Sequence, residues 1–203
     1  MRLTKFMIAG LIALLATPVW AQTPETVRIR VRGTVDALDG QKLVVKARSG
    51  DLTEIAFPPG TPVLAMVKKS LADIQSGDFV GVTSMRGADG RMNALEVHIF
   101  PEAMRGTNEG QFAWDLGPDT TMTNGAITGS ASAPDGRTLK VNHKGVDSEI
   151  TVSPQTSIVA YAPGDAGLLV PGATVLVQAV KQPDGSLTAT RVNAEKDGVK
   201  PPM

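Results

Sequence analysis

The sequence predicts an all-β protein in which two small barrels follow one another along the chain. Three features predict this: short runs in which apolar and polar residues alternate, Asp-Gly pairs between those runs, and matching residues about 95 positions apart. The composition agrees with a globular chain, because 42% of the 203 residues are hydrophobic and 20 basic residues balance 20 acidic ones.

Residues 1–21 have the pattern of a secretory signal peptide. Arg2 and Lys5 precede an apolar run, Phe6 to Ala16, and small residues follow at the positions that specify cleavage. The run is about half as long as the ~20 apolar residues that a membrane-spanning helix needs, and no later stretch replaces it. We therefore expect a protein that is exported to the periplasm, loses residues 1–21 and keeps no transmembrane segment.

The composition argues against several classes of site. Without cysteine the chain has no disulfide, no thiolate nucleophile, no Cys-ligated zinc and no iron–sulfur cluster. Loss of residues 1–21 removes two basic residues and no acidic one, and a weakly acidic chain is a poor partner for nucleic acid. The sequence also has no Gly-x-Ser-x-Gly, phosphate-loop or His-Glu-x-x-His motif. We expect no nucleic-acid partner, no cofactor and no enzymatic activity.

An internal repeat is the most informative feature of the chain. Matching residues, at an offset of 96 and then of 95, are Gly33 and Gly129, Leu43 and Leu139, Val45 and Val141, Val80 and Val175, Val82 and Val177, and Val97 and Val192. The change of offset needs only a one-residue loop deletion. A shared register of apolar residues, glycines and Asp-Gly turns predicts a first repeat over residues 22–100 and a second over 123–194.

Each copy has the element order of a known small barrel. Apolar and charged residues alternate without a break in Val27–Arg32, as in a strand with one buried face, and Asp-Gly suits tight hairpin turns. A short helix is predicted over 68–76, where Leu71 and Ile74 lie three apart. The strands predicted in the first copy cover 27–37, 42–47, 52–57, 79–85 and 92–99. Three strands, a helix and two strands is the order of the five-stranded OB-fold, and a sandwich of six or seven strands is the alternative.

The remaining segments connect and end the two copies. Residues 101–122 lack periodicity but contain Phe112 and Trp114, and large apolar rings are unusual in a flexible linker. We expect this connecting segment to be ordered against the barrels. The charged, proline-containing tail over 195–203 is expected to be flexible.

Three runs carry a resemblance to a known family: residues 98–106 (HIFPEAMRG), residues 114–118 (WDLGP), and the ending that runs from Asp197-Gly198 to Pro201-Pro202-Met203. The chain resembles an exported bacterial family of unknown function with a repeated OB-like domain. The resemblance implies an exported OB-like module and transfers no catalytic or binding residue. Relatives are sometimes named metal ABC transporter permease, which this sequence does not support, because a permease needs several membrane-spanning helices.

Glu96 and His98 are candidates for proton transfer or for binding a metal. They lie two apart in a predicted strand and so share a face. The second copy has Arg191 and Asn193 at the matching positions. Two polar neighbours on a solvated strand face are common, so a surface pair is the favoured interpretation and a metal site the weaker one.

Arg28, Arg30 and Arg32 form a stripe along the first predicted strand. The stripe is a candidate site for an anionic envelope glycan or a lipid head group. The favoured alternative is a charged outer strand that discourages aggregation between sheets. Trp114 and Tyr161 are candidate platforms for a flat ligand, although aromatic rings more often cover a core.

The sequence therefore favours a noncatalytic binding module of the cell envelope. Its expected partners are a small molecule, an ion or an envelope glycan, and an envelope protein is a further candidate. An interaction or structural accessory protein of the envelope is the alternative function, and a hydrolytic enzyme is the least favoured. OB-like barrels commonly bind ligands on one face or between their loops.

Overall fold

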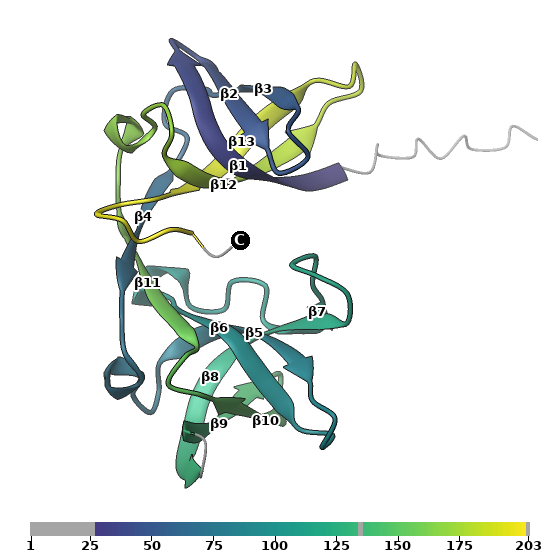
Figure 1. Cartoon of the computed structure of the whole chain (residues 1–203), viewed down its shortest axis with the longest axis vertical. Helices are drawn as coiled ribbons and strands as arrows, with labels where there is room; N and C mark the ends of the chain where they lie inside the picture. The colour runs from purple at the N-terminus through teal and green to yellow at the C-terminus, as the bar shows by residue number, and fades with distance from the viewer. Residues whose placement is uncertain (1–26, 134–135, 202–203) are drawn as a thin grey trace, which may run out of the picture.

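The computed structural model describes residues 27–133 and 136–201, which consist mostly of β-strands (Figure 1). The strands are β1 (Val27–Asp39), β2 (Lys42–Ala47), β3 (Leu52–Ala56), β4 (Val63–Lys68), β5 (Phe79–Arg86), β6 (Met92–Ile99), β7 (Gly110–Ala113), β8 (Thr120–Ala133), β9 (Gly136–His143), β10 (Val146–Val152), β11 (Ser157–Pro163), β12 (Thr174–Lys181) and β13 (Leu187–Ala194). Only short 3-10 turns accompany them in this part of the chain: η1 (Leu71–Asp73), η2 (Glu102–Met104) and η3 (Ala166–Leu168). The all-β prediction is confirmed. The predicted signal peptide lies outside the described residues.

Five strands close a first hydrogen-bonded ring. β1 pairs with β2 and β12, β2 pairs with β3, and β12 pairs with β13, all antiparallel. A parallel contact between Thr188 of β13 and Ala56 of β3 completes the ring. Buried apolar side chains fill its interior, among them Val35, Leu43, Val45, Ile55, Val177 and Val192. Each such side chain stabilises the ring by about 1.5–3 kcal/mol relative to leaving it exposed.

Five other strands close a second ring in the same way. β8 pairs with β5 and β9, β9 with β10, and β5 with β6, again antiparallel. Parallel pairing of Ile150 with Met92, between β10 and β6, completes it. Its interior contains a second apolar cluster that includes Val80, Val82, Val97, Leu139, Val141 and Ile150. β7 is added at the outside of β8.

Each ring takes its strands from both halves of the chain. The first ring combines β1–β3 with β12 and β13, and the second combines β5 and β6 with β8–β10. Two tandem barrels, one from each half, would instead pair β1 with β5 and β8 with β12. The strand pairing therefore differs from the tandem arrangement that the sequence predicts. The two copies have the same apolar register, so a strand of either copy fits the same place in a ring.

β4 and β11 connect the two rings. β4 starts beside β13, with Val63 paired to Val192, and β11 starts beside β6, with Ile158 paired to Val97. Residues 64–68 of β4 pair with residues 159–163 of β11, antiparallel. In Figure 1 they run side by side from one ring to the other. This two-stranded ribbon holds the rings next to each other and leaves a cleft between them.

Corresponding backbone contacts recur in the two rings. The carbonyl oxygen of Val35 accepts a hydrogen bond from the N–H of Gly172 at 2.8 Å, and that of Ile127 accepts one from Gly77 at 2.8 Å. Val35 of the first ring therefore corresponds to Ile127 of the second.

Gly33 and Gly125 lie two positions before Val35 and Ile127, and they allow neighbouring strands to approach closely. A Cβ atom at Gly33 would lie 2.0 Å from the carbonyl oxygen of Lys46, and one at Gly125 would lie 2.3 Å from that of Asn142. At Gly129 the nearest atom would be 4.0 Å away. Gly33 thus corresponds to Gly125, and the sequence alignment of Gly33 with Gly129 is wrong.

The helix expected over 68–76 is also wrong. Only the single 3-10 turn η1 forms. The N–H and the hydroxyl of Ser70 donate hydrogen bonds to the Asp73 carboxylate at the start of this turn, and the chain leaves the helical conformation directly after Asp73. The spacing of Leu71 and Ile74 suits a 3-10 turn, which has three residues per turn. Ile74 is already extended and is buried against the second ring.

The segments outside the rings form short elements and turns. The connecting segment over 101–122 holds η2, β7 and the start of β8. The tail, expected to be flexible, forms a turn in which Lys196 and Val199 exchange backbone hydrogen bonds of 3.2 and 2.8 Å, and Pro201 is buried. In Figure 1 this end of the chain lies between the two rings.

Candidate functional site

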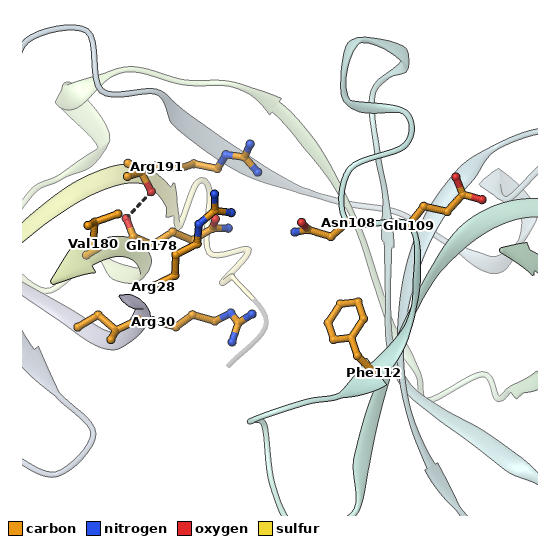
Figure 2. A pocket seen from close by; sticks show the side chains of 11 residues that line it. Arg28, Arg30, Asn108, Glu109, Phe112, Gln178, Val180 and Arg191 are labelled. Carbon is orange, nitrogen blue, oxygen red and sulfur yellow. Dashed lines mark hydrogen bonds between the residues drawn. The ribbon is translucent and has the colours of Figure 1, made fainter. Parts of the chain in front are cut away.

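A cleft of about 640 Å³ lies between the two rings. One wall is the outer face of β1, β12 and β13, and the other consists of β7 and the residues just before it (Figure 2). Its principal lining residues are Arg28, Arg30, Gln178, Arg191, Asn108 and Phe112. Because both rings or their attached segments contribute side chains, the cleft exists only when the rings are joined.

The strand register places three arginines close together on the first wall. Arg30 of β1 is opposite Gln178 of β12, and Gln178 is opposite Arg191 of β13. Arg28 lies two residues before Arg30 and so points to the same face. Figure 2 shows the three arginine side chains extending into the cleft, toward Asn108 and the opposite wall.

This arginine wall (Arg28, Arg30 and Arg191) carries more positive than negative charge. In the described part of the chain, neither Arg28 nor Arg191 has a carboxylate within 4.0 Å, whereas Arg30 Nη1 lies 3.4 Å from Asp115 Oδ2. Glu109 lines the opposite wall and accepts a hydrogen bond from the backbone of Lys144 at 2.8 Å. Among the described residues, the guanidinium groups of Arg28 and Arg191 therefore have no anionic partner.

Trp114 and Asp115 contact two residues of the arginine stripe, Arg30 and Arg32. The Arg30 guanidinium carbon lies 4.1 Å from the centre of the Trp114 ring, and that of Arg32 lies 5.7 Å from it. Asp115 Oδ1 accepts a hydrogen bond from Arg32 at 2.8 Å. Burial raises the pKa of Asp115, but the hydrogen bond and the charge of Arg32, with the charge of Arg30, outweigh it and lower the pKa below its ordinary value. One face of Trp114 is thus occupied by an arginine.

A chain of buried polar side chains lies deeper between the rings. The hydroxyl of Tyr161 lies 2.9 Å from His98 Nδ1, and His98 Nε2 is hydrogen-bonded to the carboxylate of Glu96. Thr83 Oγ1 lies 3.4 Å from the same carboxylate. Only 4% of His98 and 6% of Glu96 are exposed, so these residues do not form the solvated surface pair that the sequence favours.

The protonation of this chain follows from its surroundings. Burial raises the pKa of the Tyr161 phenol, and the negative charge of Glu96 raises it further, against a smaller opposite effect of Arg191. Tyr161 is therefore protonated at neutral pH.

The crossing strands assemble this chain. In β11, Val159 is opposite His98, and Tyr161 lies two residues further along and so on the same side. The register of β11 with β4, and of β4 with β13, places Asn193 on this side as well. Residues from both rings therefore meet over the ribbon.

A small inner chamber of about 50 Å³ adjoins the cleft. Asn108, Phe112, Gln178 and Arg191 line both spaces. The residues that line the chamber and not the cleft include His98, Tyr161, Asn124, Asn193, Met122 and Leu176. A ligand in the cleft can therefore extend one small group into the chamber.

Two buried oxygen atoms in this region lack a hydrogen-bond donor. They are Oδ1 of Asn124 and Oδ1 of Asn193, each without a partner among the described residues. Asn124 is 5% and Asn193 is 1% exposed. Asn124 Nδ2 donates to the carbonyl oxygens of Thr107 and Asn108 at 3.2 and 3.1 Å, which fixes the orientation of its amide.

The structure brings the sequence-predicted candidates together in two groups. Arg28 and Arg30 line the cleft, and Arg30 and Arg32 contact Trp114. Glu96, His98 and Tyr161 form the buried chain. Sequence reasoning missed Asp115, Asn124, Arg191 and Asn193 as site residues. For Arg191 and Asn193, the sequence did give a signal, because they match the candidates Glu96 and His98 of the first copy.

Two other kinds of feature are absent from the described residues. No group of three or more His, Cys, Asp or Glu side chains in residues 27–133 and 136–201 is arranged to hold a metal ion. Nor does this part of the chain contain a helix with the length and apolar character needed to cross a membrane.

One part of the chain matches a known protein family. Residues 124–193 match the family model of a domain of unknown function, DUF5666. The matched segment runs from β8 to β13, so its strands are divided between the two rings. Neither the curated proteins nor the solved structures compared with the chain gave a significant match. The match agrees with the expected resemblance to a family of unknown function.

Proposed function

We propose that this protein is a noncatalytic binding module of the periplasm whose ligand is a small organic anion held between the two rings. The observation that carries the proposal is the arginine wall. Arg28 and Arg191 face the cleft with no carboxylate partner in the described structure. Guanidinium groups bind carboxylates and phosphates through paired hydrogen bonds. Since like charges repel, a bound anion would also stabilise the wall.

The scaffold supports a binding role. We infer that each ring is an OB-like barrel and that the two barrels arose by duplication and exchanged their last two strands. In support, both rings have three consecutive strands, a fourth and fifth strand paired with each other, and a parallel contact between the third and the fifth. OB-like barrels use an outer face and its loops for ligands, and the cleft lies on such a face.

The two barrels differ in the polar residues of corresponding faces. Arg191 and Asn193 of β13 occupy the places that Glu96 and His98 have in β6, since Val192 pairs with Val177 as Val97 pairs with Val82. The apolar interiors are alike, whereas one outer face is basic and the other is not. This difference supports a single anion site on the first ring over two equal sites.

The polar groups of the cleft support binding over catalysis. Thr190 is the only hydroxyl residue among the described residues that line the cleft, and it donates its hydrogen to the carbonyl oxygen of Gln178 at 3.1 Å. Both ring nitrogens of His98 are engaged, by Glu96 and by Tyr161. Nucleophilic catalysis needs a nucleophile beside a free base, and the described residues of the cleft do not offer this pair.

Export to the periplasm is part of the proposal. Its support is the pattern of Arg2, Lys5 and the apolar run that follows, which is typical of a signal peptide.

Isothermal titration calorimetry with hexanoate and D-gluconate tests the proposal. At least one acid should bind, and the double variant Arg28→Gln/Arg191→Gln should weaken that binding at least tenfold. Arg48→Gln is the matched control, because Arg48 is an exposed arginine away from the cleft. Absence of binding by both acids, or equal binding by the double variant, would contradict the proposal.

A further inference from the structure

We infer that the ligand is a hydroxylated organic acid, such as a sugar acid, whose acidic group binds the arginine wall and whose hydroxyl end enters the inner chamber. This inference rests on the proposed function and specifies the ligand. The two parts of the site differ in what they offer a ligand. The cleft presents positively charged hydrogen-bond donors, and the chamber presents buried hydrogen-bond acceptors.

The acceptors of the chamber are two oxygen atoms. Oδ1 of Asn124 and Oδ1 of Asn193 are buried without a donor among the described residues. Buried acceptors left unpaired cost about 1–3 kcal/mol each, so a group that donates hydrogen bonds here is strongly favoured.

One of these acceptors has a fixed orientation. Asn124 cannot turn its amide without losing the hydrogen bonds from Nδ2 to Thr107 and Asn108, so its Oδ1 stays an acceptor. A ligand group that carries hydrogens is therefore favoured beside it.

The nearby positive charge decides between the donors that a ligand can offer. Arg191 lines both the cleft and the chamber, so an ammonium group or a metal cation entering the chamber would meet a like charge. A hydroxyl group donates without charge. The chamber volume of about 50 Å³ suits one small polar group, since a water molecule takes up about 30 Å³ in the liquid.

Comparison of three probes of similar size tests the inference by calorimetry. D-Gluconate has the charge and the hydroxyls, hexanoate has the charge alone, and D-glucose has the hydroxyls alone. The protein should bind gluconate at least tenfold more tightly than either of the others. The variant Asn193→Leu, which removes one chamber acceptor, should bring the affinity for gluconate to within about threefold of that for hexanoate.

The outcomes separate this inference from the function on which it rests. Equal affinities for gluconate and hexanoate, both lost in Arg28→Gln/Arg191→Gln, would overturn the hydroxyl selectivity and leave the anion site standing. Unchanged gluconate affinity in Asn193→Leu would overturn the role of the chamber. Binding of neither acid would overturn the inference and the proposed function together. Hexanoate binding by Asn193→Leu serves as the control that the variant is folded.

Discussion

The hydroxyl of Tyr161, in the crossing strand β11, is hydrogen-bonded to Nδ1 of His98 in the second ring, across 2.9 Å. The contact joins the ribbon that connects the rings to the polar chain that ends at Glu96. It also positions the Tyr161 side chain, which lines the inner chamber.

Titration of Tyr161 should show a pKa above the ordinary 10.0. Tyr161 is the only tyrosine in the chain, so the ultraviolet absorbance of tyrosinate reports it alone. Because burial raises the pKa in the folded state, the stabilising contribution is complete below the unfolded pKa and is lost as pH rises from about 10 toward the folded pKa. Reversible ionisation near pH 10 with the fold intact would contradict this description.

Removal of the Tyr161 hydroxyl should destabilise the protein through His98. In Tyr161→Phe, the buried Nδ1 of His98 loses its hydrogen-bond partner, and the free energy of unfolding should fall by about 1–3 kcal/mol. Urea denaturation followed by circular dichroism measures the change. A double-mutant cycle with His98→Gln isolates the contact. If the two substitutions were additive, the residues would not act as a pair.

Substitution of Asp115 should have a pH-dependent effect. The pKa of Asp115 is lowered in the folded state from the ordinary 3.8, so its contribution to stability is present above about pH 4 and is lost as pH falls through the folded pKa. Asp115→Asn should therefore be less stable than the original protein at pH 7, and the two should converge at low pH. The difference should stay below about 1 kcal/mol, because the Asp115 side chain is 47% exposed. Asp36→Asn, at an exposed position, is the control, and an equal effect there would contradict the role of the ion pair.

The glycines give a test of how the two halves correspond. Gly33→Ala and Gly125→Ala should each lower the free energy of unfolding by about 1–3 kcal/mol or more, because the added Cβ would meet a backbone carbonyl oxygen. Gly129→Ala is the matched control, since its Cβ would have ordinary contacts only. Thermal denaturation of the three variants measures the difference. A large effect at Gly129 with none at Gly125 would restore the alignment of Gly33 with Gly129.

Much of the local structure could be predicted from the sequence. The alternation in Val27–Arg32 predicted the start of β1, and the runs near Val45 and Val82 predicted β2 and β5. Local patterns decide these elements. The partner of each strand could not be predicted, because Val175 and Val177 of β12 match Val80 and Val82 of β5 and would fill the same places beside β1. That choice depends on the course of β4 and β11 between the rings.

Because the partner of each strand could not be predicted, the site could be predicted only in part. The arginine stripe and the Glu96–His98 pair were visible as neighbours within single strands. Arg191 and Asn193 join them only when β13 belongs to the ring of β1, and Asn124 meets Asn193 only when the rings face each other. Sequence spacing carries no information about that contact.

Cysteine pairing tests most directly the central claim that each ring is built from both halves of the chain. The protein has no cysteine of its own, and Val27 of β1 is paired with Lys181 of β12. Arg86 is the residue of β5 that corresponds to Lys181, since each begins the pairing with the following strand. Under mild oxidation, Val27→Cys/Lys181→Cys should form an intramolecular disulfide, detected by peptide mass mapping, and Val27→Cys/Arg86→Cys should not. A disulfide in the second variant and none in the first would show tandem barrels and contradict the exchange of strands on which the cleft depends.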